Sequence, residues 1–448
     1  MWYFCAMSAE KSTIESITAK LDIKSLNTMQ HAAINTVREN DEIILLSATG
    51  SGKTLAFLIP VLQSLDPSVK LVQALILVPS RELALQIEDV LKKIQSGYKI
   101  TSCYGGHKRE IEENNLVQPP AIIIATPGRM ADHIRRKNVD MAAIHFLVLD
   151  EFDKSLELGF LEEMDFIINS IPAAKKRMLT SATFAVEIPA FVKMKNAVSL
   201  NFLSADSNKP VALSVRKVHS PENDKLETLF NLICYLKNTS TIIFCNHREA
   251  VERTSHYLSD KGIVNVFYHG GMEQHEREVA LVKFKNTSSD ILVTTDLASR
   301  GLDIANIRSI IHYHLPANED AFIHRNGRTA RMEATGNVYI IINPEEETPA
   351  YLGSDAEELI ITGEQTLPEK PKWSTLFIAA GKKDKINKID VVGFLSNKGN
   401  LKKDEIGLVD IKDFAAFAAV RKSKIGNVVE LVKNEKIKNK KVKVAVAK

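Results

Sequence analysis

A glycine-rich segment near the N-terminus has the residue types that phosphate binding requires. Gly50 and Gly52 allow backbone N–H groups to turn toward phosphate oxygens, and the start of a helix adds positive potential. Lys53 can reach the outer phosphates of a nucleotide, and the Thr54 hydroxyl can bind Mg²⁺. The full segment reads Ser47-Ala48-Thr49-Gly50-Ser51-Gly52-Lys53-Thr54, with Ser47 where the general motif has a glycine. A simple glycine turn is the alternative, but the strand-like run before it and the helix-like run after it favour a nucleotide site.

Three acidic side chains follow a second apolar run, Phe146-Leu147-Val148-Leu149. In open α/β sheets ligands bind at the carboxyl ends of strands, which is where Asp150 and Glu151 would lie. Asp150 is then placed to hold Mg²⁺, and Glu151 to orient and deprotonate a water that attacks a phosphate. Acids at the start of a helix, Asp153 among them, are the simpler alternative. Their pairing with a phosphate loop favours hydrolysis of a nucleoside triphosphate.

These residues need a parallel sheet to position them, and the sequence predicts one. Short runs rich in β-branched residues alternate with amphipathic segments of helix length, which is typical of βα units. The same alternation begins again after a polar segment, so two such domains are expected. The predicted strands are 42–46, 74–78, 121–125 and 146–149 in the first domain and 241–245, 291–294 and 309–313 in the second.

The length of 448 residues also favours several domains, because single domains typically have about 100 to 200 residues. We expect an N-terminal extension, two large domains joined by a linker, a second linker and a small C-terminal domain. In that order, the predicted ranges are 1–20, 21–203, 204–212, 213–366, 367–373 and 374–448.

The composition is that of an ordinary globular protein, with 45% hydrophobic and 25% charged residues. No apolar run reaches the roughly 18 to 20 residues of a membrane helix, so no membrane contact is expected. The four cysteines, Cys5, Cys103, Cys234 and Cys245, have neither disulfide nor metal spacing. They are expected to be buried thiols in a reducing cytoplasm.

Basic charge is concentrated at the C-terminus, although the whole chain carries only +3. Residues 372–448 contain 19 Lys and Arg against 8 Asp and Glu, whereas the rest of the chain has 8 more acidic than basic residues. Such a block can be a solvated surface or a surface that binds a polyanion such as a nucleic acid. The folded character of the segment, considered below, favours polyanion binding.

The order of the motifs resembles that of the DEAD-box family of RNA helicases over most of residues 20–340, with Phe152 in place of the family's alanine. The resemblance implies two tandem RecA-like P-loop domains with parallel sheets, and an enzyme that couples ATP hydrolysis to RNA remodelling. It implies that Gln30 recognises adenine and that Gly301 and Asp303 face the nucleotide. The implied remaining ATP and Mg²⁺ contacts are Ala48, Thr49, Gly50, Ser51, Gly52, Lys53, Thr54 and Asp150.

Further family-like blocks in the expected order imply contacts with the RNA backbone. Glycines, hydroxyls and arginines at loop ends suit phosphate and 2′-OH groups, although a Pro-Gly-Arg sequence alone would be read as a turn. In the first domain the residues are Pro79, Arg81, Gly105, Gly106, Thr126, Gly128 and Arg129. In the second they are Gln274, Arg277, Thr294 and Arg300.

The resemblance also assigns residues that connect ATP hydrolysis to the RNA site. Asp153 would be bridged by the hydroxyls of Ser181 and Thr183. The block His324-Arg325-Asn326-Gly327-Arg328-Thr329-Ala330-Arg331 would complete the ATP site, with Ala330 in place of the usual glycine. Arginines such as Arg328 and Arg331 stabilise charge on a transferring phosphoryl group, an effect worth about 10³ to 10⁵ in rate in comparable enzymes.

The tail is predicted to form a small α+β domain of the RNA-recognition type. Strands at 375–378 and 414–420 and helices at 388–395 and 425–432 fit a βαββαβ order. The aromatic RNA-binding signature of that fold is poor, so Phe414 and Phe417 are expected to pack in the core.

A run from Thr375 to Ile386, followed by Asp390-Val391-Val392-Gly393 and Ile406-Gly407, resembles the C-terminal domain of DbpA-type helicases. That resemblance implies binding to a hairpin in the peptidyl-transferase region of bacterial 23S rRNA, with Lys382 and Lys383 among the contacts. It implies a role in assembly of the large ribosomal subunit, with RNA and pre-large-subunit particles as partners.

The expected function is an ATP-dependent RNA helicase, monomeric and cytoplasmic. ATP and RNA would bind together and close the two domains around Lys53, Glu151 and Arg328, separating RNA strands locally. An ATP-gated RNA clamp or scaffold would share every ATP-site residue and stays open as an alternative. A DNA helicase or another P-loop ATPase is disfavoured by the RNA-type blocks and the tail.

Overall fold

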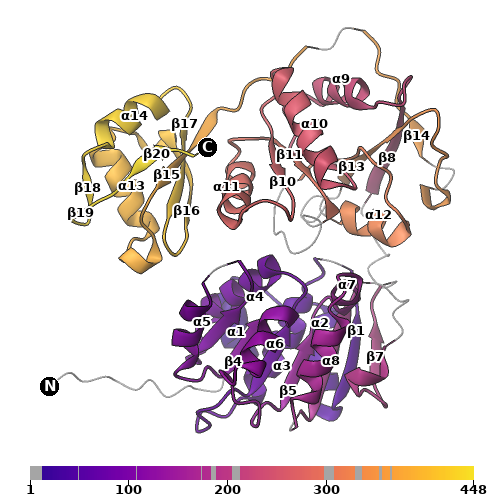
Figure 1. Ribbon diagram of the computed structural model, residues 1–448, viewed down its shortest axis with the longest axis vertical. Helices are drawn as coiled ribbons and strands as arrows, with labels where there is room; N and C mark the ends of the chain where they lie inside the picture. The colour runs from indigo at the N-terminus through magenta and orange to yellow at the C-terminus, as the bar shows by residue number, and fades with distance from the viewer. Residues whose placement is uncertain are drawn as a thin grey trace. The chain divides into compact units, whose positions relative to one another are not determined.

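The structure of the protein, shown in Figure 1, is a computed structural model. The residues that it describes are 13–48, 50–106, 108–172, 174–182, 188–203, 212–296, 307–327, 335–352, 356–363 and 366–447. Within them, the residues up to 203 form one compact unit and those from 212 form a second. None of the helices in these ranges combines the length and apolar character that a bilayer crossing requires.

The described part of the first unit contains a seven-stranded parallel sheet in the order β3-β4-β2-β5-β6-β1-β7. Its central strands are buried on both faces, which explains why they appear in the sequence as continuous apolar runs. Their bounds are β1 (Glu42–Leu46), β2 (Ala74–Leu77), β3 (Ile100–Cys103), β4 (Ile122–Ala125), β5 (Phe146–Leu149), β6 (Lys176–Ser181) and β7 (Val198–Asn201). The four strands predicted for this domain are confirmed.

Two apolar clusters make up the core of the first unit, one containing Phe57 and Ile76 and the other Leu75 and Phe152. Helix α1 lies within the range predicted as an N-terminal extension, yet Ile17 is fully buried in the first cluster. The folded unit therefore begins earlier than predicted. The helices are α1 (Ile14–Lys20), α2 (Thr28–Glu39), α3 (Lys53–Ser64), α4 (Arg81–Ile94), α5 (Arg109–Leu116), α6 (Pro127–Arg135), α7 (Phe152–Glu157) and α8 (Leu161–Asn169).

The described part of the second unit repeats this plan with a parallel sheet in the order β10-β11-β9-β12-β13-β8-β14. Its strands are β8 (Ala212–His219), β9 (Thr241–Phe244), β10 (Val266–Tyr268), β11 (Ile291–Thr294), β12 (Ser309–His312), β13 (Thr335–Ile342) and β14 (Glu357–Glu358). Its helices are α9 (Leu226–Leu236), α10 (Arg248–Asp260), α11 (Gln274–Lys285) and α12 (Glu319–Asn326). The predicted pair of parallel α/β domains is thereby confirmed.

The second unit ends in a small domain whose antiparallel sheet has the order β16-β17-β15-β20. The predicted βαββαβ order is confirmed. A hairpin, β18 (Lys436–Ile437) with β19 (Lys440–Lys441), precedes the last strand. The remaining elements are β15 (Trp373–Ile378), α13 (Lys388–Asn397), β16 (Ile406–Ile411), β17 (Ala416–Arg421), α14 (Ile425–Val432) and β20 (Val444–Val446).

One face of this small sheet packs against α11, a helix of the preceding α/β domain. Phe417 is buried in a cluster with Val279 and Val282 of α11, and the ring of Phe377 lies 5.6 Å from that of Phe417. Phe417 is buried as predicted, but it lies on this outer face, apart from the core between the sheet and its own helices. The prediction for Phe414 is wrong, because 62% of its surface is exposed.

Polar contacts also join the small domain to the preceding α/β domain. The side chain of Asn286, which follows α11, donates a hydrogen bond to the Thr375 hydroxyl of β15 at 2.9 Å, and that hydroxyl contacts Ser288 at 2.8 Å. Asn286 and Thr375 are both buried. Buried polar groups that satisfy each other fix the register of the surfaces that carry them.

Only glycine fits at position 381 of the small domain, because neighbouring backbone atoms leave no space for a Cβ. A Cβ there would lie 2.2 Å from Lys412 O and 2.7 Å from Ala415 N. We expect Gly381→Ala to destabilise this domain by roughly 1–3 kcal/mol, as overpacking does. Urea unfolding of the full chain, followed by the fluorescence of Trp373 in β15, measures this loss.

Gly393→Ala is the control, because Gly393 lies within α13 and a Cβ there meets nothing within 4 Å. Alanine should stabilise that helix by about 0.5–1 kcal/mol. Equal unfolding midpoints for the two variants would contradict the packing argument for Gly381.

Candidate functional site

The predicted phosphate loop connects β1 to α3. Gly52 has φ +93° and immediately precedes the helix, which begins at Lys53. A Cβ on Gly52 would lie 2.5 Å from the side-chain nitrogen of Gln30, so both the backbone angle and the space require glycine. Gly50 also has a positive φ, of 86°. The loop therefore has the strand-loop-helix geometry that the sequence predicts.

Hydrogen bonds close this loop upon itself. The Ser47 hydroxyl donates to the Ser51 hydroxyl at 2.6 Å, and the backbone N–H of Ser47 donates to Ser181 O at the end of β6. Serine at the first position of the motif thus bridges the two sides of the loop. The Lys53 ammonium group is buried and donates to the backbone oxygens of Ser47 and Ala48. The loop thus holds the Lys53 ammonium group against its own backbone carbonyl oxygens.

Gln30 joins α2 to the same loop. Its side-chain oxygen accepts the N–H of Asn27 at 2.9 Å, and its side-chain nitrogen donates to Gly52 O at 3.1 Å. Asn27 caps the start of α2 and donates from its own amide to Ser51 O at 2.9 Å. Gln30 therefore lies beside the phosphate loop, and its contact with adenine stays a prediction.

The acidic residues follow β5, whose neighbour β6 lies between β5 and β1 in the sheet. Asp150 is buried and accepts a hydrogen bond from the Thr180 hydroxyl at the end of β6. The backbone N–H of Glu151 points to Asp150 Oδ1 at 3.1 Å and to the Thr180 hydroxyl at 3.2 Å. Thr180 was not predicted as a site residue, although it lies directly before the predicted Ser181.

The environment of Asp150 controls its protonation. Burial raises the pKa of Asp150 above its usual value, while the hydrogen bond from Thr180 and the charge of Lys53 oppose that rise. Burial likewise raises the pKa of Asp153, and Lys154 opposes it. Both carboxylates thus depend on nearby donors and cations to stay ionised.

Backbone strain is present at Glu151, which has φ 48° although it is not glycine. Such a conformation costs on the order of 1–3 kcal/mol and is often found at functional sites. The strained turn directs the chain into α7, where Phe152 is fully buried among Leu149, Met164 and other apolar side chains. A phenylalanine in place of the family's alanine is therefore accommodated in the core.

The predicted RNA contacts of the first unit follow β2, β3 and β4, which are neighbours in the sheet. Their loops consequently meet at one edge. Gly105 and Gly106 are exposed, and Thr126, Gly128 and Arg129 are partly exposed. The Arg81 guanidinium lies 4.7 Å from the ring centre of Tyr104. Pro79, two residues before Arg81, is buried.

In the second unit, Gln274 and Arg277 lie in the first turn of α11, and Arg277 donates to the side-chain oxygen of Gln274 at 2.7 Å. Thr294 is 0% exposed, and its hydroxyl donates to Tyr268 O at 2.8 Å. This burial disagrees with the prediction that Thr294 contacts RNA. The next residue, Thr295, is only partly buried and is the better candidate.

Arg325 connects several elements of the second unit, although no individual role was predicted for it. Its side chain is 1% exposed, pairs with both carboxylate oxygens of Asp296 and donates to Asn246 and to His314 O. It thus joins the end of β11 to α12, which carries the buried His324. Arg325 and its partner Asp296 each lie within a family-like block, and this position could have indicated their importance.

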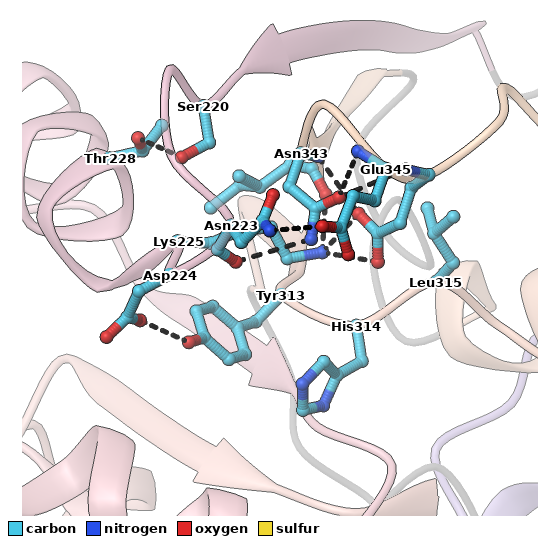
Figure 2. A network of polar contacts seen from close by, with 12 residues as sticks. Ser220, Asn223, Asp224, Lys225, Thr228, Tyr313, His314, Leu315, Asn343 and Glu345 are labelled. Atoms are coloured by element: carbon cyan, nitrogen blue, oxygen red, sulfur yellow. Dashed lines mark hydrogen bonds and ion pairs between the residues drawn. The ribbon is translucent and has the colours of Figure 1, made fainter.

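A second polar network, shown in Figure 2, lies at the carboxyl ends of β12 and β13. The buried Lys225 ammonium group donates to Glu346 at 2.7 Å and to Ile341 O at 2.9 Å. Burial, followed by the charge of Lys225, lowers the pKa of His314 to about 4, so this imidazole is neutral at pH 7. Asn343 accepts the N–H groups of Glu345 and Glu346 at 3.0 Å. The network fixes the loops at this edge of the sheet.

Several predicted site residues lie outside the described residues. They are Thr49, Thr183, Arg300, Gly301, Asp303, Arg328 and Arg331.

Three family models match successive parts of the chain. They are DEAD/DEAH box helicase at residues 27–191, helicase conserved C-terminal domain at 224–333, and DbpA RNA binding domain at 375–446. The chain is 31% identical over 441 residues to the ATP-dependent RNA helicase DbpA of Escherichia coli (strain K12), covering 96% of each chain. It is 30% identical over 449 residues to the ATP-dependent RNA helicase DbpA of Bacillus subtilis (strain 168), covering 93% of each.

Solved structures give the same result for the two large domains. S. cerevisiae Dbp5 bound to RNA and ADP BeF3 has a TM-score of 0.66 and 25% identity, over 78% of this chain and 95% of that one. Mss116p bound to ssRNA and AMP-PNP has a TM-score of 0.66 and 27% identity, over 77% and 76% of the two chains.

The Thr180 hydroxyl should influence how ATP hydrolysis depends on pH. Thr180→Val keeps the shape of the side chain but removes the hydrogen bond to Asp150. Because that bond opposes the effect of burial, its loss raises the pKa of Asp150 further. Because the carboxylate is lost as pH falls through that pKa, activity should fail at higher pH in the variant. We expect the midpoint of the acid limb in the pH profile of ATP hydrolysis to move to higher pH by roughly one unit, since a hydrogen bond to a charged group contributes about 1.5–3 kcal/mol.

Thr241→Val is the control, because the Thr241 hydroxyl is bonded to Thr239 O in the second unit and does not contact Asp150. Its profile should coincide with that of the wild type. Coincident acid limbs for Thr180→Val and the wild type would disprove the role given to Thr180.

Proposed function

Because the chain belongs to the DEAD/DEAH box helicase family, we propose that Lys53, Asp150 and Glu151 hydrolyse ATP and that the small domain directs the enzyme to 23S rRNA. The general activity, that of an ATP-dependent RNA helicase and RNA-dependent ATPase, comes with membership of the family. We further propose which residues hydrolyse ATP and which RNA the small domain recognises.

The observation that carries the catalytic proposal is the convergence of the phosphate loop with the ends of β5 and β6. Lys53 would bind the outer phosphates, and backbone N–H groups of the loop would surround them. Asp150 and the Thr54 hydroxyl are hard oxygen donors that suit Mg²⁺. When bound, Mg²⁺ would supply positive charge to the phosphate oxygens.

Glu151 is the proposed general base. Its strained backbone is held by the hydrogen bonds to Asp150 and Thr180, which fixes where its side chain starts. A carboxylate in this place can orient the attacking water and accept its proton. Arg328 and Arg331 are proposed to stabilise the charge that develops on the transferred phosphoryl group.

Replacing the base without changing its shape tests this assignment. Glu151→Gln should lower RNA-stimulated ATP hydrolysis by about 10² to 10⁴-fold, the usual contribution of a general base, while ATP binding persists. Glu157→Gln is the control, because Glu157 lies on the following helix and pairs with Lys154. Hydrolysis that survives Glu151→Gln would refute the proposed role.

The proposed rRNA contact is a lysine cluster formed by Lys382, Lys383, Lys385, Lys438 and Lys440, all of them exposed. The hairpin β18–β19 lies against the turn after β15, because Lys438 donates to Lys385 O at 2.8 Å and Lys440 pairs with Asp384. The outer face of the sheet packs on α11, which buries Phe417 and partly buries Phe377. The lysine cluster is an exposed basic surface that offers positive charge to phosphate groups.

The choice of 23S rRNA draws support from the DbpA model and from the two relatives named DbpA. Lys382→Ala/Lys383→Ala should raise the concentration of a peptidyl-transferase-region fragment needed for half-maximal ATPase by about 10-fold at fixed salt. Stimulation by a generic RNA should change less. Lys402→Ala/Lys403→Ala, which removes two exposed lysines elsewhere on this domain, is the control.

Equal stimulation of the wild type by the fragment and by generic RNA would reject the ribosomal target. Equal stimulation by matched DNA would also reject selectivity for RNA.

A further inference from the structure

We propose that Glu112 is a positioning residue that holds the RNA-contacting loops of the first unit in place. The inference rests on the proposed RNA contacts of that unit. Glu112 lies on α5, is 1% exposed, and belongs to no motif identified in the sequence.

Its carboxylate contacts two other segments of the first unit, the end of β3 and helix α6. One oxygen accepts the backbone N–H of Tyr104 at 2.9 Å. The other accepts the Arg129 guanidinium at 3.1 Å and lies 2.7 Å from His133 Nε2. A single buried side chain therefore joins the end of β3, the start of α6 and the next turn of α6.

Two of these contacts reach a predicted RNA-binding block. Tyr104 directly precedes Gly105 and Gly106, and its ring lies beneath the Arg81 guanidinium at 4.7 Å. Arg129 is the last residue of the Thr-Pro-Gly-Arg block. Two of the loops that follow neighbouring strands thus contact one carboxylate, and the segment that carries Arg81 is linked to it through the ring of Tyr104.

The charges in the group are paired. Asn138 lies with its side-chain nitrogen 3.1 Å from His133 Nδ1, so the amide donates there and leaves the imidazole proton on Nε2, facing Glu112. The Glu112 carboxylate is thus paired with one guanidinium and faces the Nε2 atom of His133. Buried ions need such pairing, because an isolated one would shift its protonation instead.

A metal site is the competing interpretation, because ligand atoms of Cys103, Glu112 and His133 all lie within 4.8 Å of one another. The Arg129 guanidinium already occupies the carboxylate, and a second cation beside it would be repelled in a buried setting. Burial also raises the pKa of the Cys103 thiol, which disfavours the thiolate that a metal would bind. The hydrogen-bonded network explains the group without an ion.

Removal of Glu112 is expected to change RNA binding in the direction opposite to that expected from its charge. Removing an acidic residue near a surface that binds RNA should strengthen binding, because it removes repulsion from the phosphates. Removing Glu112 should weaken binding, because Arg129 and the loop at Gly105 lose the acceptor that aligns them.

The experiment measures ATPase activity of the full chain against RNA concentration at fixed salt. Glu112→Ala should raise the RNA concentration for half-maximal rate by about 10-fold, the size of one lost RNA contact, more than it lowers the rate at saturation. Glu112→Gln, which keeps the shape and one acceptor, should raise it less and remains informative if the alanine variant fails to fold. Glu113→Ala, which removes the same charge from a more exposed neighbour on α5, should leave it unchanged or lower it.

A double-mutant cycle shows whether Glu112 acts through Arg129. The loss of RNA binding in Glu112→Ala/Arg129→Ala should be smaller than the sum of the two single losses, because both changes remove the contact between Glu112 and Arg129, while only the change at Glu112 removes the contact with the Tyr104 N–H. Additive losses, or Glu112 variants that bind RNA as well as the wild type, would overturn the inference. A wild type that RNA does not stimulate would instead overturn the proposed function, so the two failures are distinguishable.

Discussion

The parallel pairing of strands is the constraint on which both α/β domains depend. A parallel sheet covered by helices is apolar on both faces, so polar chemistry is confined to the strand ends. Because all strands point the same way, their carboxyl ends meet at one edge. Lys53 after β1, Asp150 after β5 and Thr180 at the end of β6 become neighbours for this reason, although they are far apart in sequence.

Burial at that edge makes each charged group depend on its partners. Asp150 has the Thr180 hydroxyl, Glu112 has Arg129 and a backbone N–H, and Arg325 has Asp296. Taking an ion out of water costs several kcal/mol, so such groups contribute defined geometry more than net stability. The sites are thus built from pairs whose members lie on different strands or helices, and moving one element displaces the partner of another.

The sequence predicted the strands, the phosphate loop and the βαββαβ tail because each has a local signature, such as apolar runs or glycines at fixed spacing. It did not predict Thr180, Glu112 or Arg325, whose importance arises from contacts across the sheet or between helices. Thr294 was assigned to RNA by its place in a family-like block, yet the pairing of β11 with β10 buries it. Phe414 was assigned to the core by its type, but it lies in the turn before β17 and is exposed.

The most direct test of the whole account is strand separation rather than ATP consumption. A short RNA duplex joined to the peptidyl-transferase-region hairpin of 23S rRNA, labelled to report dissociation, would be mixed with the protein and excess competitor strand. The account predicts rapid dissociation with ATP and Mg²⁺, slow dissociation without ATP, and little acceleration when the hairpin is absent. Stable binding of the duplex with ATP and no faster dissociation would contradict it and would identify the protein as an ATP-gated RNA clamp.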